Sequence, residues 1–166
     1  IHLETIQTAD GGYLSGGQSF SGASGDKSQP NWDPTQGSND YWIIKTDAQG
    51  LKQWDKRFGG TSFELFASIR QTNDGGYIIS GSSFSGISGD KTQANQGSWD
   101  YWVVRTNSLG VKIWDKRFGG LDDDFATSMD RTADGGYIIG GYSKSDVGGD
   151  KTQPCQGNWD YWVVKI

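Results

Sequence analysis

Cysteine and histidine are almost absent from this sequence, each occurring once. A single cysteine, Cys155, cannot form an intrachain disulfide, and a metal site built from cysteines is excluded. His2 is the one histidine and lies at the terminus, so Ser-His-Asp and Cys-His catalytic arrangements find little support. The sequence therefore predicts a protein that is not an enzyme, although paired carboxylates that hydrolyse glycosides remain open.

Positive charge is also scarce, with a formal net charge of −5 and a pI near 4.7. Binding to phosphates needs a basic face, so nucleic acid is not expected as a main partner. The sequence contains no apolar run long enough to span a bilayer and no signal peptide. Because the chain begins at Ile1 rather than Met, we expect it to be processed, trimmed or cut from something larger.

Apolar residues make up only 33% of the chain, yet glycine occurs 26 times and aromatic residues reach 13%. A disordered chain lacks such aromatic content. The mixture is typical of many short strands joined by tight turns and packed through Trp, Tyr and Phe. An all-β fold is the prediction.

A repeat organises the chain. Residues 72–120 have near copies in residues 8–60 and 132–166, and Asp40, Asp100 and Asp160 are each 60 apart. The first copy carries four extra residues around 31–34. We therefore predict one domain, 1–166, made of the units 1–60, 61–120 and 121–166, with the last unit lacking its final strand.

Four strands are predicted in the complete unit, over residues 66–72, 77–84, 100–106 and 111–118. Asn-Asp-Gly-Gly at 73–76 is a strong hairpin signal. Segment 100–106 is almost continuously apolar and is expected to be buried on both faces. Four antiparallel strands need neighbours for their edges, and radial repetition supplies them, so each unit is interpreted as one blade of a β-propeller. A β-trefoil, which also has three four-stranded repeats, is the alternative.

The order of these strands resembles the blades of WD-repeat propellers. The fuller pattern DGGY(I/V)I…GDK(T/S)Q…DYW(V/I)(V/I)(K/R)T…WDKRFGG looks like the propeller-type repeats of large secreted or surface bacterial proteins. This resemblance implies a secreted or cell-surface location. Propellers have roughly four to eight blades, so three blades imply a longer chain or a homo-oligomer, preferably a dimer that completes six blades.

Strand parity places the two longest connections of every unit at the same end, where binding residues tend to gather. Their recurring Trp, Asp and Gln are typical of sugar recognition, because indole covers C–H patches while carboxylates and amides bind hydroxyls. The candidate ligand-binding residues are Asp26, Gln29, Trp32, Gln36, Asp90, Gln93, Gln96, Trp99, Asp150, Gln153, Gln156 and Trp159.

A structural interpretation of the same loops stays open. The aspartate of each Gly-Asp-Lys motif can fold its loop through an Asx-turn, and the aspartate that begins each third strand can cap it. The tryptophan inside each third strand is expected to pack between blades. Cys155 occurs in one copy, near the position of Ala94 and Pro30, and has no assigned role.

The sequence thus predicts a non-catalytic, lectin-like module with a glycan as its partner and no cofactor. Weak calcium binding at Asp122, Asp123 and Asp124 is left open. The alternative function is a structural spacer or protein-interaction segment of a larger secreted adhesin or enzyme.

Overall fold

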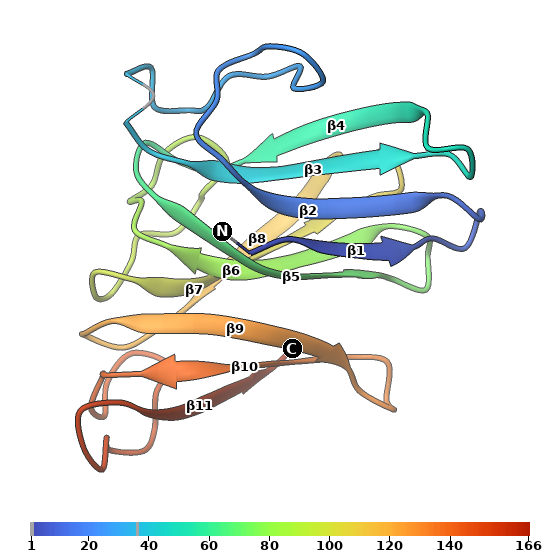
Figure 1. The fold of residues 1–166 in the computed structure, drawn as a ribbon. Helices are drawn as coiled ribbons and strands as arrows, with labels where there is room; N and C mark the ends of the chain where they lie inside the picture. Colours follow the sequence, from blue (N-terminus) through green and yellow to red (C-terminus); the bar gives the residue numbers. More distant parts are fainter. Residues whose placement is uncertain (1, 36) are drawn as a thin grey trace.

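The structure, a computed structural model, describes residues 2–35 and 37–166. These residues form three separate antiparallel sheets (Figure 1), so the all-β prediction is confirmed. Within the same ranges there is no helix of the length and apolarity that a membrane crossing needs.

The three sheets follow one another along the chain, and within each sheet the strands keep their sequence order. The first sheet contains β1 (Glu4–Gln7), β2 (Tyr13–Ser19), β3 (Asp40–Thr46) and β4 (Lys52–Phe58). The second contains β5 (Glu64–Gln71), β6 (Tyr77–Ser83), β7 (Asp100–Thr106) and β8 (Lys112–Phe118). The third contains β9 (Asp124–Arg131), β10 (Tyr137–Ser143) and β11 (Asp160–Lys165).

The four strands predicted for the complete unit are therefore observed as β5 to β8. The hairpin between β5 and β6 closes with a hydrogen bond from the Thr72 N–H to the Gly76 carbonyl, 2.9 Å. Gly75 in this turn has a φ of 81°, a left-handed conformation that glycine adopts without steric cost. The third sheet has three strands in the described part of the chain, as the incomplete third repeat predicts.

Two apolar cores join the three sheets, one on each face of the second sheet. On one face, Trp102 and Val104 pack with Tyr41 of the first sheet. On the other face, Val103 packs with Ile139 of the third sheet. Side chains alternate between the faces of a strand, so β7 is buried on both sides as predicted.

A tyrosine at each junction packs against a glycine of the next sheet. The Tyr101 hydroxyl lies 3.0 Å from the Trp162 carbonyl oxygen, to which it donates. A Cβ on Gly141 would lie 2.4 Å from that hydroxyl, so only glycine leaves room for it. Tyr41 and Gly81 form the equivalent contact between the first and second sheets.

The long loops lie together at one end of the molecule, and the short hairpins lie at the other (Figure 1). At the loop end, the linker between two sheets bonds to the long loop of the following sheet. The Asp90 N–H donates to the Gly59 carbonyl at 2.8 Å, and the Asp150 N–H donates to the Gly119 carbonyl at 2.9 Å. The expectation that both long connections share one end is therefore confirmed.

Candidate functional site

A buried lysine closes each long loop. Lys91, from the second Gly-Asp-Lys motif, is 1% exposed and donates from Nζ to the Gln93 carbonyl at 2.7 Å and to Asn95 Oδ1 at 2.6 Å. Lys27 and Lys151 are buried in the same way. Burial lowers the pKa of Lys91 to about 8. The Gly-Asp-Lys motif therefore folds the long loop, and it does so mainly through the hydrogen bonds of its lysine rather than through its aspartate.

An asparagine completes the same loop in two of the three copies. Asn95 donates from Nδ2 to the carbonyls of Ser83 and Ser98, at 2.7 and 2.8 Å. In the third copy Cys155 takes this position, with Sγ 3.7 Å from the Ser143 carbonyl. Cys155 thus corresponds to Asn95 rather than to Ala94, which corrects the sequence alignment.

The variant Cys155→Asn is expected to raise the free energy of unfolding by about 1 kcal/mol, because an amide restores hydrogen bonds that a thiol makes weakly. Urea denaturation of both proteins measures the change. The reciprocal variant Asn95→Cys is the matched control and should lower the midpoint by a similar amount. Unchanged midpoints in both variants would contradict this role.

Several predicted ligand residues bind the protein itself. Gln29 Oε1 accepts from the Arg57 N–H at 3.1 Å, and Gln93 Oε1 accepts from the Arg117 N–H at 2.9 Å. These amides hold the long loop to the last strand of its own sheet. Gln96 also belongs to this group, because its amide lies 2.8 Å from the guanidinium of Arg117.

The aspartates of the second and third Gly-Asp-Lys motifs reach across to the preceding linker. The Asp90 carboxylate accepts from the Gly59 N–H at 3.3 Å, and the Asp150 carboxylate accepts from the Gly119 N–H at 3.1 Å. These bonds run between repeats, whereas the expected Asx-turns would lie within one loop. In the first copy, the Asp26 side chain is exposed.

The aspartate that begins each third strand is structural, as one interpretation predicted. Asp40 accepts from the Trp32 N–H at 2.8 Å, and Asp100 accepts from the Gln96 N–H at 2.7 Å. Asp160 accepts from the Gln156 N–H in the third copy. Each carboxylate therefore fixes the end of its long loop.

The tryptophans predicted as ligand residues fall into two groups. Trp32, from the insertion of the first copy, donates from Nε1 to Asp90 at 2.8 Å, and its ring lies 4.2 Å from the Arg57 guanidinium carbon. Trp99 and Trp159 lie elsewhere, in the aromatic row described next. Of the remaining candidates, Gln153 and Gln156 line an open groove, and Gln36 lies outside the described residues.

Five aromatic side chains form a continuous row at the loop end of the second and third sheets. Neighbouring rings in this aromatic row are separated by 5.2 to 5.9 Å between centroids. Its members are Phe84, Trp99, Phe125, Tyr142 and Trp159. Three of them are between 41% and 45% exposed, which leaves an apolar strip open to solvent. The sequence pointed to the two tryptophans, but the other members come from strand ends whose proximity only the fold shows.

A buried carboxyl pair lies at each junction between repeats. Asp40 and Glu64 converge on Gly59, where an added Cβ would lie 2.1 Å from one carboxyl and 2.7 Å from the other. Burial raises the pKa of Glu64 to about 8, and it raises the pKa of Asp100, in the second pair with Asp124, to about 6. All four side chains are fully buried, so these pairs are out of reach of a substrate.

Stability is expected to fall as the pH rises from about 5 to about 7.5. A carboxyl whose folded pKa lies above its unfolded value stabilises the fold while protonated, and this contribution is lost as the pH passes through the folded pKa. We expect a loss of about 2 kcal/mol across this range. Urea denaturation at several pH values measures it.

The variant Glu64→Gln is the control for this pH dependence, because a neutral amide cannot ionise. Its stability should change less between the same two pH values than that of the wild-type protein. A wild-type stability that rises across the range would contradict the assignment.

No cluster of three metal-ligating side chains occurs among residues 2–35 and 37–166. The carboxylate of Asp124 turns inward, where it accepts from the Gly120 N–H at 2.7 Å and from Ser145 Oγ at 2.9 Å. It is therefore already occupied by the protein and is separated from the exposed Asp122. The geometry does not favour calcium at this triplet.

No protein-family model matches the chain. A curated protein that it resembles is the regulatory protein FlaEY of Caulobacter vibrioides, with 27% identity over 142 residues. The match covers 82% of this chain and 15% of FlaEY, so the chain spans a small part of that relative's length.

Proposed function

We propose that the chain is a non-catalytic binding module whose ligand is a carbohydrate, bound on the aromatic row. The observation that carries this proposal is the row itself, a strip of half-exposed rings at the end of the molecule where the long loops gather. Aromatic faces stack on the C–H patches of sugar rings, and several neighbouring rings can follow an extended chain of sugars.

A polar side chain that could bind sugar hydroxyls lies close to this strip in the sequence. Gln156 is exposed and precedes Trp159 by three residues. By contrast, the aspartates of the second and third Gly-Asp-Lys motifs, the equivalent glutamines Gln29 and Gln93, and Gln96 are occupied by internal bonds. The proposed contact surface is therefore narrower than the twelve loop residues suggested by the sequence, and it is centred on Trp99 and Trp159.

A glycan array, followed by titration of any glycan that binds, tests the proposal. Trp159→Ala and Tyr142→Ala are each expected to weaken binding at least tenfold, since stacking on one aromatic ring contributes about 1.5 kcal/mol. Trp32→Ala is the matched control, because this exposed tryptophan lies outside the aromatic row and should leave the affinity unchanged. Absence of binding to every glycan, or binding that survives both substitutions, would reject carbohydrate as the ligand.

A structural spacer or protein-interaction segment of a larger bacterial protein is the second candidate function. The match to 15% of FlaEY supports it, because a similar stretch there is part of a much longer protein. A blank glycan array from a correctly folded protein would favour this candidate. Both candidate functions imply that the protein is secreted or lies on the cell surface. Fractionation of the producing cells tests this location.

We also propose that the three sheets are β-propeller blades and that two copies of the chain complete a six-bladed ring. The exposed end sheets support this arrangement, because they carry the two halves of the tyrosine–glycine contact. Tyr161 on the third sheet is 95% exposed and corresponds to Tyr101. Gly17 on the first sheet corresponds to Gly141, and with Trp42 it lines a cavity of about 200 Å³. Tyr161 of one copy would enter this cavity in the other.

Sedimentation equilibrium tests ring closure. The wild-type protein is expected at twice the mass of one chain, and Tyr161→Ala should dissociate it to single chains. Gly86→Ala is the control, since an added Cβ there meets no atom within 4 Å. A wild-type protein that remains a single chain of 18.1 kDa would contradict closure by two copies.

A further inference from the structure

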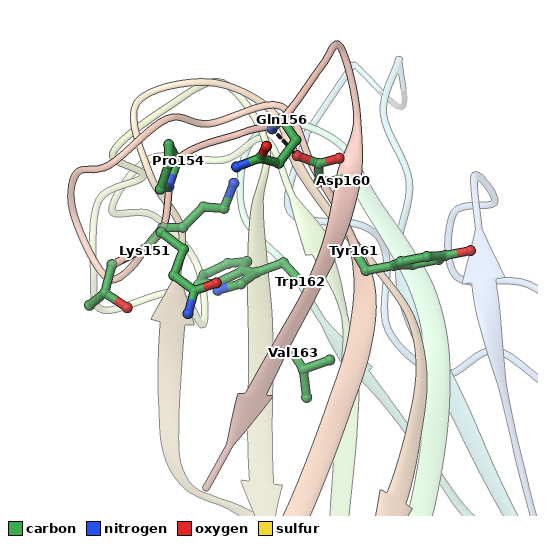
Figure 2. A pocket seen from close by; sticks show the side chains of 9 residues that line it. Lys151, Pro154, Gln156, Asp160, Tyr161, Trp162 and Val163 are labelled. Carbon is green, nitrogen blue, oxygen red and sulfur yellow. Dashed lines mark hydrogen bonds between the residues drawn. The ribbon is translucent and has the colours of Figure 1, made fainter.

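The first and second sheets enclose a pocket at the hairpin end of the molecule, opposite the long loops. Its volume is about 480 Å³, and all the residues that line it fall within the range 9–109, so the first two repeats supply the whole of it. Pockets for small molecules have volumes of about 300 to 1,000 Å³. This pocket is separate from the groove in Figure 2, which lies beside β11.

Two aromatic rings form a rigid wall of the pocket. Trp54 comes from β4 and Tyr77 from the start of β6, and their ring centroids are 5.8 Å apart with the ring planes at 56°. Tyr77 belongs to the apolar core between the two sheets, and Trp54 packs against that core. Because the core fixes both rings, they offer a preformed surface for the C–H groups of a ligand.

The hydroxyl of Tyr77 is available to a ligand. Tyr77 is only 3% exposed, yet its hydroxyl has no hydrogen-bond partner among residues 2–35 and 37–166. Burial, together with the nearby Asp10 carboxylate, raises the pKa of Tyr77, so the hydroxyl keeps its proton at neutral pH. A polar group at such a buried place is normally hydrogen-bonded, which points to a ligand that bonds to it.

Two glutamines in the same wall keep their amino groups free. Gln71 Oε1 accepts from the Ala9 N–H at 2.8 Å, and Gln53 Oε1 accepts from Lys45 Nζ at 3.0 Å. These bonds orient both amides, and neither Nε2 has an acceptor in the part of the chain that the structure describes. The pocket therefore offers two amide donors beside the tyrosine hydroxyl.

The charges in the pocket cancel. Lys45 Nζ lies 2.9 Å from Asp10 Oδ2. Hydrogen bonds from Thr8 and Lys45 foremost hold the pKa of Asp10 well below its usual range, so the pair is ionised at neutral pH. An anionic ligand is repelled by Asp10, and a cationic ligand is repelled by Lys45. The pocket therefore selects a neutral ligand that combines an apolar face with several hydroxyl groups.

We propose that this pocket binds one neutral pyranose ring, with the apolar face of the sugar on Trp54 and its hydroxyls bonded to Tyr77, Gln53 and Gln71. The exposed side of the Asp10 carboxylate accepts from a further hydroxyl. The site shares no residue with the aromatic row and lies at the other end of the molecule. It therefore stands or falls independently of binding on that row.

Fluorine NMR of the intact chain labelled with 5-fluorotryptophan tests the proposal. The Trp54 resonance is identified by its loss in Trp54→Phe, and the probes are glucose, galactose, mannose, fucose and N-acetylglucosamine. At least one sugar is expected to shift the Trp54 resonance in a saturable way. A sugar bound only on the aromatic row would instead shift Trp99 or Trp159, so the two sites are distinguished in one spectrum.

Variants separate recognition from structure. Tyr77→Phe should weaken the binding of that sugar about fivefold, the effect of one lost hydrogen bond. The midpoint of urea denaturation should stay unchanged, because the hydroxyl has no partner in the described residues. Trp159→Ala, in the aromatic row, is the control and should leave the Trp54 titration unaltered.

Charged analogues test the preference for a neutral ligand. Glucuronate and glucosamine should each bind more weakly than glucose does. Tighter binding of either analogue would overturn the assignment of a neutral ligand. Absence of a saturable Trp54 shift with all five neutral sugars up to about 100 mM would overturn the site itself, as would unchanged affinity in Tyr77→Phe.

Discussion

Replacement of Gly81 by alanine is expected to lower the free energy of unfolding by about 3 kcal/mol or more. An added Cβ would lie 2.1 Å from the Leu65 carbonyl oxygen and 2.5 Å from the Tyr41 hydroxyl. Neither can move aside easily, because Leu65 belongs to the paired strand β5 and Tyr41 is fully buried. Chemical denaturation followed by intrinsic tryptophan fluorescence measures the loss.

The equivalent change in the first sheet supplies the control. Gly17 has the same place in its repeat as Gly81, yet a Cβ there would meet only ordinary contacts, at 3.4 Å from the His2 carbonyl and 3.5 Å from Leu3 Cδ1. Gly17→Ala should therefore change the stability of a single chain by less than about 1 kcal/mol. Equal effects of the two substitutions would show that the tyrosine–glycine contact does not limit packing.

The second large effect is expected for Asp115→Ala, which should destabilise the protein by about 3 kcal/mol. The substitution leaves Trp102 Nε1 and the Thr92 N–H without their acceptor at a buried site. It also removes the ion pair with Lys112, whose Nζ lies 2.8 Å from Asp115 Oδ1. The long loop of the second sheet thereby loses one of its contacts with β8, while the bond between Gln93 and Arg117 remains.

Urea denaturation measures this effect, and Asp122→Ala is the control because that side chain is exposed. The control should stay within about 0.5 kcal/mol of the wild-type protein. The contribution of Asp115 should also be lost in acid, since its pKa is lowered in the folded state and its stabilisation disappears as the pH falls through that value. An Asp115→Ala protein as stable as the control would refute the assigned network.

The repeat made most of the fold predictable. The predicted strands of the second sheet agree with the observed ones to within two residues at each end. They were predicted from the alternation of apolar residues, the Asp-Gly turns and the spacing of the three copies. Parity of the strands then placed the long loops at one end. These features depend on local sequence and on counting, which a single sequence contains.

The site was less predictable, because residue type does not show which partner a polar side chain chooses. Gln93 and Asp90 have the chemistry of sugar ligands, yet both bind backbone N–H groups of their own chain. Phe125 and Tyr142 had no sequence signal as ligand residues, because they lie within strands. They join Trp159 only after folding brings β9, β10 and the third loop together.

The second sheet is buried between two neighbouring sheets, and this burial also determines the order in which the sheets unfold locally. Trp102 and Val103 are 0% exposed on opposite faces of β7, whereas Tyr161 and Val163 of β11 face solvent. In a single chain that no second copy covers, each sheet contacts only its neighbours, so local opening starts at the end sheets and reaches the middle sheet last. Amide protons of β6 and β7 would therefore exchange with solvent most slowly, and those of β11 would exchange early.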